Sequence, residues 1–134
     1  MAAVQYDRVE LQDETHVVRV RHRVREWASK LGFSLVDQTK LVTAASELAR
    51  NAVVHGGGGV AEIQAVENNG RRGIRIAFVD NGPGIPDVAV ALRDGFTTVE
   101  GLGLGLGGAK RLVHDMHIES RAGAGTTVTI TRWK

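Results

Sequence analysis

Glycine clusters divide this sequence more sharply than any other feature. Seventeen glycines occur in 134 residues, and many gather at 56–59, 82–84 and 101–108. Because glycine interrupts helices and strands, regular elements must lie between these clusters. Main-chain atoms at glycine can also approach a flat or charged ligand closely. The clusters are therefore the first loops to test for ligand binding.

Two helices are predicted before the first glycine cluster. Apolar residues recur at helical spacing from Val17 to Leu31, and Gly32 ends that helix. Ser34 and Asp37 resemble a capping box that opens a second helix, at about 36–55. Its predicted buried stripe consists of Leu41, Ala45, Leu48, Ala49 and Ala52.

Alternating apolar residues predict strands before, between and after the remaining glycines. These strands are expected near 4–11, 61–65, 74–80, 117–122 and 126–130, with a hairpin turn at 68–70 and further helices at 86–95 and 105–115. This order predicts one domain over 1–134, an α/β two-layer sandwich (α+β). Its sheet would be mixed but mostly antiparallel, with the helices on one face.

Composition excludes several classes of protein. The absence of cysteine excludes disulfides and thiolate metal sites, and it suits the cytoplasm. No apolar run is long enough to cross a bilayer, and the first residues do not resemble a signal peptide, so we expect a cytoplasmic protein without membrane contact. The arginine-rich run at 19–25 is interpreted as a solvated helix flank, so no nucleic-acid partner is predicted.

Glu47, Asn51 and His55 are spaced by four residues on the second predicted helix. This spacing places them on one side, away from the apolar stripe. A carboxylate and a carboxamide in this arrangement suit a general base and a magnesium ligand. The alternative is an ordinary polar helix face.

Asp80 closes a predicted strand and precedes Asn81-Gly82-Pro83-Gly84. It has the parity of the apolar residues in that strand, so its side chain should point towards the helices. A carboxylate there needs a hydrogen-bond donor, and an adenine amino group is one candidate. An aspartate that merely caps the turn is the alternative.

Two further features could contact a nucleotide. The glycine run at 101–108 precedes a predicted helix and could cradle an anion, or it could serve as a hinge. Thr126 follows Gly125 with inward parity, so its hydroxyl needs a partner, either a nucleotide or the turn itself.

Together these motifs resemble the GHKL superfamily of ATPases and kinases, which has the Bergerat ATP-binding fold. The resemblance spans nearly the whole chain, with the motifs in the family's order. The matching segments are Glu47 to Gly56 as the N box, Asp80 to Gly84 as the first glycine box, Gly103-Leu104-Gly105 as the second, and Gly125-Thr126.

Within that superfamily the sequence is most similar to the stressosome switch serine/threonine-protein kinases. The shared phrases include Ser46 to Asn51, Gly82 to Asp87, Asp94 to Phe96 and Ile118 to Ser120. The resemblance implies STAS-domain antagonist and scaffold proteins as substrates, and activation of a PP2C-type phosphatase in stress signalling. Monomer and dimer stay equally open.

The resemblance also implies ATP and Mg²⁺ as cofactors and a role for each residue. Glu47 would be the catalytic base, and Asn51 would contact the nucleotide and hold magnesium. Asp80 would bind adenine, with Thr126 assisting through water. The remaining expected nucleotide contacts are Gly82, Gly84, Gly103, Leu104, Gly105 and Leu106.

Two alternative functions stay open. The related anti-sigma-factor kinases usually carry an arginine where this sequence has Gly101, which favours the switch-kinase interpretation over an anti-sigma factor kinase. A nucleotide-gated binding module, without catalysis, is the other alternative.

Overall fold

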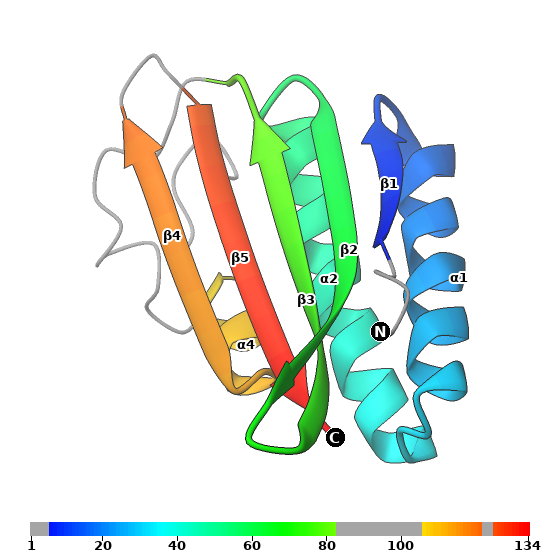
Figure 1. Ribbon diagram of the computed structural model, residues 1–134. Helices are drawn as coiled ribbons and strands as arrows, with labels where there is room; N and C mark the ends of the chain where they lie inside the picture. Colours follow the sequence, from blue (N-terminus) through cyan, green and yellow to red (C-terminus); the bar gives the residue numbers. More distant parts are fainter. Residues whose placement is uncertain (1–5, 83–105, 122–124) are drawn as a thin grey trace.

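The computed structural model describes residues 6–82, 106–121 and 125–134. Within these ranges, five strands form one sheet and three helices pack against it (Figure 1). The strands are β1 (Tyr6–Leu11), β2 (Gly59–Asn68), β3 (Arg71–Asp80), β4 (Asp115–Arg121) and β5 (Gly125–Trp133). The helices are α1 (Glu14–Lys30), α2 (Leu35–Val54) and α4 (Leu106–Arg111). The helix predicted at 86–95 lies outside the described residues.

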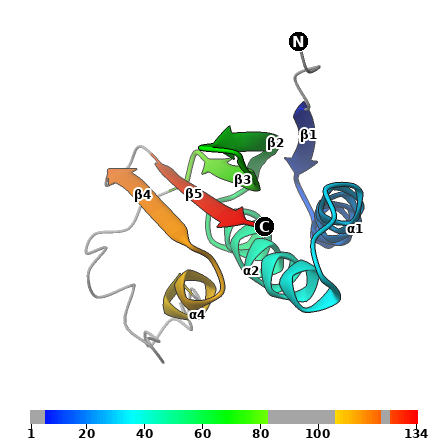
Figure 2. The same cartoon turned by 60° about the horizontal axis from the view of Figure 1, so that its bottom comes forward.

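The strand order is β1-β2-β3-β5-β4, and each pairing between the described strands is antiparallel. Figure 2 shows the helices gathered on one side of the twisted sheet. The predicted two-layer α/β architecture is confirmed, although the described part of the sheet is wholly antiparallel where a mixed one was expected. Among the described helices, none is both long and hydrophobic enough to cross a lipid bilayer.

Local sequence determines where the two long helices begin. The Asp13 carboxylate accepts hydrogen bonds from the first free amides of α1, and the Ser34 hydroxyl accepts one from the Asp37 amide in α2. Each of the five residues predicted as the buried stripe of α2 is buried in the core between helix and sheet. The predicted bounds of α2 are correct to within one residue.

The hairpin between β2 and β3 sets the register of the sheet. Asn69 and Gly70 both adopt positive φ angles, 52° and 79°, as a two-residue type I′ turn requires. With this register, Asp80 at the end of β3 lies opposite Gly59 on one neighbour and Thr126 on the other. The turn at one end of the hairpin thus determines which residues meet at the other end.

The helix predicted at 105–115 is shorter than expected, because α4 ends at Arg111. The amide of His114 donates to the carbonyl of Thr131 at 3.0 Å, and Asp115 already pairs with Thr131 in the sheet. The main chain after Arg111 therefore forms hydrogen bonds with β5 before another helical turn can form. Strand β4 accordingly begins at 115, two residues earlier than predicted.

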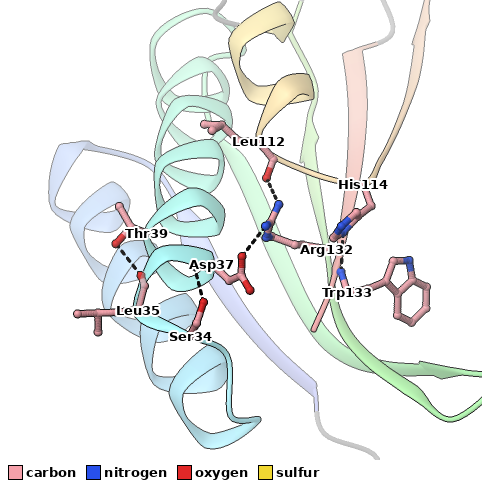
Figure 3. A network of polar contacts seen from close by, with 8 residues as sticks. All are labelled: Ser34, Leu35, Asp37, Thr39, Leu112, His114, Arg132 and Trp133. Carbon is pink, nitrogen blue, oxygen red and sulfur yellow. Dashed lines mark hydrogen bonds and ion pairs between the residues drawn. The ribbon is translucent and has the colours of Figure 1, made fainter.

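A buried arginine joins the second layer to the far end of the sheet (Figure 3). Arg132 on β5 contacts Asp37 of α2 at 2.6 Å and donates to the carbonyl of Leu112, just after α4, at 2.8 Å. Its side chain is only 11% exposed. Nearby, the amide of Trp133 donates to Nδ1 of His114. Burial of the His114 ring is the main cause that lowers the pKa of His114, and the nearby positive charge of Arg132 is the second. Both favour the neutral form of the ring.

We expect Asp37→Asn to destabilise the protein by about 1.5–3 kcal/mol at neutral pH, because it leaves the Arg132 charge without its carboxylate. The hydrogen bond from Arg132 lowers the pKa of Asp37 below 3.8. The stabilisation from the Asp37–Arg132 pair is therefore fully present above the pKa of Asp37 in the unfolded chain. It is lost as the pH falls through the lower pKa that Asp37 has in the folded protein. Urea unfolding at several pH values measures this, with the exposed Glu67→Gln as control. An equal cost at acidic and neutral pH would contradict the charge explanation.

Candidate nucleotide site

Three chain segments meet at the end of the sheet where β3 finishes: the end of α2, the end of β3 and the start of β5 (Figure 1). A Cβ atom added to Gly56, just after α2, would lie 2.5 Å from Cγ of Asp80. One added to Gly82 would lie 2.6 Å from Cα of Gly56. Any side chain at either position would displace its neighbours, so glycine is required for this close approach.

Asp80 occupies the centre of this meeting point. Its carboxylate lies against Gly56 at the end of α2, so the prediction that it points towards the helices is confirmed. The main-chain amide of Gly82 donates to Oδ1 of Asp80 at 2.9 Å. This bond holds the orientation of the carboxylate, as an aspartate at the start of a turn commonly does. The second oxygen is not engaged by that bond and suits a donor from a ligand.

Thr126 lies directly across from Asp80 in the register of β3 and β5. Its side chain is 8% exposed, and its hydroxyl lies 3.0 Å from that of Ser120 on β4. Asp80, Ser120, Gly125 and Thr126 all contribute to the wall of one open cavity of about 500 Å³. The inward parity predicted for Thr126 is confirmed by its burial.

Glu47 and Asn51 lie four residues apart on α2, which separates them by about 6 Å along the helix axis. The Glu47 carboxylate is 43% exposed and lies 3.7 Å from Arg50, which also lies 3.5 Å from Glu14. Asn51 is partly buried, and its main-chain carbonyl accepts from the amide of Gly56. Neither side chain lines the cavity of about 500 Å³ beside Asp80 or the second described cavity, beside β1 and β2. Their roles stay predictions.

The structure describes only part of the remaining predicted nucleotide contacts. Gly84, Gly103, Leu104 and Gly105 lie outside the described residues. Leu106 begins α4, and its side chain is 1% exposed in the core, so only its main chain remains available to a ligand. Within the described ranges, no group of three or more histidine, aspartate or glutamate side chains is arranged to hold a metal.

Sequence reasoning assigned no role to two residues of this site. In the sequence, Gly56 was identified only as the last residue of a motif. In the structure, the Asp80 side chain packs directly against it. Ser120 pairs with Thr126 across the hairpin of β4 and β5. Centring that hairpin on the turn at 123 in the sequence would have placed these hydroxyls opposite one another. His55 is the C-cap residue of α2, and it lines a second cavity beside β1 and β2.

Comparison with known proteins identifies the class. The model of the histidine kinase-, DNA gyrase B- and HSP90-like ATPase family matches residues 36–134. This range includes the end of α2, the end of β3 and the start of β5, which form the candidate site. The chain therefore belongs to this ATPase family, the GHKL family. The family prediction made from the sequence is confirmed.

Two groups of relatives are informative. The chain is 42% identical over 125 residues to the serine/threonine-protein kinase RsbT of Bacillus subtilis, covering 93% of this chain and 94% of the relative. This relative is a serine/threonine-protein kinase, which is the enzyme class predicted from the sequence. An anti-sigma F factor of Thermoanaerobacter is 29% identical over 116 residues, covering 82% of this chain and 80% of the relative.

Solved structures agree on the fold. The RsbU and RsbW domains of a Mycobacterium tuberculosis protein match with a TM-score of 0.65 and 26% identity, covering 99% of this chain. The chain spans only 33% of that solved chain. The histidine kinase domain of a blue-light activated histidine kinase from Erythrobacter litoralis matches with a TM-score of 0.56 and 18% identity, over 91% of this chain and 63% of its own length.

Proposed function

We propose that this chain is a cytoplasmic serine/threonine-protein kinase that phosphorylates STAS-domain antagonist or scaffold proteins. In its free form it would bind and activate a PP2C-type phosphatase, as a partner switch in bacterial stress signalling. One observation carries the nucleotide part of the proposal. A carboxylate held by a main-chain amide and a buried hydroxyl lie next to one another on neighbouring strands and line the same cavity, at the residues that the family motif assigns to adenine.

The identity to RsbT supports the kinase part, because it extends over nearly the full length of both chains. The described geometry also fits the nucleotide. Glycines at 56 and 82 let the main chain pack directly against Asp80, which holds the carboxylate in place in the wall of the cavity that Thr126 also lines. A site of this kind combines close apolar contact with a few polar groups that set orientation.

In the proposed reaction, Asp80 and Thr126 hold the adenine ring while the amides around Gly103 and Gly105 bind the phosphates. Glu47 accepts the proton of the substrate hydroxyl. The hydroxyl oxygen forms a bond to the γ-phosphorus, and the bond from that phosphorus to the bridging oxygen of ADP breaks. Asn51 would hold Mg²⁺, which neutralises phosphate charge when bound. Phosphoryl transfer depends mainly on such positioning and charge stabilisation, so few side chains are required.

A second candidate function is sequestration of a sigma factor. The anti-sigma F relatives at 28–30% identity favour it. Glycine at position 101, where anti-sigma kinases usually carry arginine, favours the switch kinase. The two functions differ in partner rather than in nucleotide site.

Incubation with labelled Mg-ATP and a set of purified STAS-domain proteins tests the proposal. We expect label on a serine or threonine of at least one STAS protein, located by mass spectrometry. The wild-type chain without a STAS protein is the control. ATP binding without transfer to any STAS protein would contradict the kinase assignment, and capture of a sigma factor instead would support the second candidate.

A further inference from the structure

Arg50, on the outer side of α2, is shared between two carboxylates. Its Nη1 lies 3.7 Å from Oε1 of Glu47, and its Nε lies 3.5 Å from Oε1 of Glu14 on α1. Both distances exceed the ~2.7–2.9 Å of a charge-assisted hydrogen bond. The Arg50 side chain is also 46% exposed. Ion pairs of this kind contribute little to stability, so the fold does not explain the place of Arg50 beside Glu47.

The geometry of α2 places Arg50 beside both helical residues that the proposed reaction uses. Each residue advances about 100° around a helix axis, so Arg50 projects about 60° to one side of Glu47 and Asn51 about 40° to the other. Residues three and four positions apart are neighbours on a helix surface. Arg50 therefore shares one face with the proposed base and the proposed magnesium ligand.

The distances permit a contact between Arg50 and the transferred phosphoryl group. A general base lies about 2.6–3.2 Å from the hydroxyl whose proton it accepts. Before attack, that hydroxyl oxygen lies about 3–3.5 Å from the phosphorus. The guanidinium, 3.7 Å from the Glu47 carboxylate, is thus only a few contact distances from the phosphorus. Because both present contacts of Arg50 are long, rotation of its exposed side chain can cover that distance.

The charge balance of the proposed reaction leaves a place for this cation. No lysine or arginine has so far been assigned to the transferred group, although an arginine there typically raises the rate of phosphoryl transfer by about 10³- to 10⁵-fold. Within the part of the chain that the structure describes, Arg50 is the one cationic side chain within 4.0 Å of the Glu47 carboxylate. When Glu47 accepts the substrate proton it becomes neutral, so Arg50 loses one of its two carboxylate partners during the transfer.

We propose that Arg50 is a catalytic residue, whose guanidinium moves from the Glu47 carboxylate to the oxygens of the phosphoryl group during transfer. The hydroxyl proton passes to Glu47, the hydroxyl oxygen bonds to the γ-phosphorus, and the bond from that phosphorus to the bridging oxygen of ADP breaks. Arg50 keeps its proton and its charge throughout, and neutralises charge on the phosphoryl oxygens. This inference rests on the proposed kinase function.

Single-turnover transfer from labelled Mg-ATP to the STAS-domain protein labelled in the test above measures the effect. We expect Arg50→Gln to lower the transfer rate at saturating substrate by ~10³-fold, the lower end for such an arginine, because the side chain is half-exposed. Binding of Mg-ATP and of the STAS protein should stay within about twofold. Arg50→Lys keeps the charge but not the planar fork, so it should retain part of the rate.

Two further measurements separate catalysis from packing and from net charge. Added guanidinium, well below denaturing concentrations, should raise the transfer rate of Arg50→Ala severalfold, and should leave that of Glu47→Gln unchanged. Arg25→Gln is the matched control, because it removes an exposed positive charge on α1 that lies 3.5 Å from Gln38. It should transfer phosphate at the wild-type rate. Thermal unfolding checks that each variant is folded, and Arg50→Lys replaces Arg50→Gln should the latter unfold.

The outcomes separate this inference from the proposed function. A wild-type chain that labels no STAS protein overturns both. Transfer by the wild type with an unchanged rate in Arg50→Gln overturns the inference alone. So does weaker STAS binding at an unchanged rate, which would make Arg50 a docking residue. An equal loss in Arg25→Gln, or a failed rescue of Arg50→Ala, also overturns it. A slow Arg50→Gln with intact binding, together with rescue by guanidinium, supports it.

Discussion

Replacing Glu47 with glutamine is expected to lower the rate of phosphoryl transfer by ~10²–10⁴-fold, because glutamine has the same shape but cannot accept the substrate proton. The affinity for Mg-ATP should stay within about twofold, since in the proposed reaction Glu47 contacts the acceptor hydroxyl rather than the nucleotide. Single-turnover transfer from labelled ATP to the STAS-domain substrate measures the rate, and calorimetry measures the affinity.

The chain offers a closely matched control for this variant. Glu14 on α1 lies 3.5 Å from the same Arg50 that lies 3.7 Å from Glu47. Glu14→Gln therefore removes an acidic partner of Arg50 without touching the proposed base, and it should leave the rate near wild type. Equal losses in both variants would assign the effect to Arg50 and not to proton transfer. A wild-type rate in Glu47→Gln would remove Glu47 from the catalytic role.

The second large effect is expected from Asp80→Asn, which should weaken binding of Mg-ATP by about 10- to 100-fold. The asparagine oxygen can still accept from the Gly82 amide, so the turn is retained. Its amide nitrogen then faces the adenine amino group, and a donor meets a donor. The lost bond involved a charged acceptor, which makes it costlier than an ordinary hydrogen bond.

Asp115→Asn is the control for this measurement, because Asp115 is exposed at the start of β4, at the opposite end of the sheet. It should bind Mg-ATP like the wild type. Thermal unfolding of both variants separates loss of the fold from loss of the site. Unchanged affinity in a folded Asp80→Asn chain would show that the carboxylate does not contact the base.

Local chemistry explains what the sequence could predict about the fold. Asp13 and Ser34 determine the starts of the helices, because a side-chain oxygen satisfies amides that lack a helical partner. The pair Asn69-Gly70 determines the hairpin, because both residues tolerate a positive φ. Errors occurred where a distant partner intervened, as at His114, whose amide pairs with Thr131 and ends the helical region early.

The residues of the candidate site can be separated in the same way, into features that local sequence predicts and contacts that only the folded chain brings together. By itself, the sequence determined the family, the residue types and the direction in which Asp80 and Thr126 point, because strand parity and helical spacing are local properties. Only the tertiary structure decided that Gly56 packs against the Asp80 carboxylate and that the hydroxyls of Ser120 and Thr126 lie within hydrogen-bond distance. Those contacts join residues far apart along the chain or across a hairpin, and they depend on strand register and helix docking, which the packing of the whole core determines.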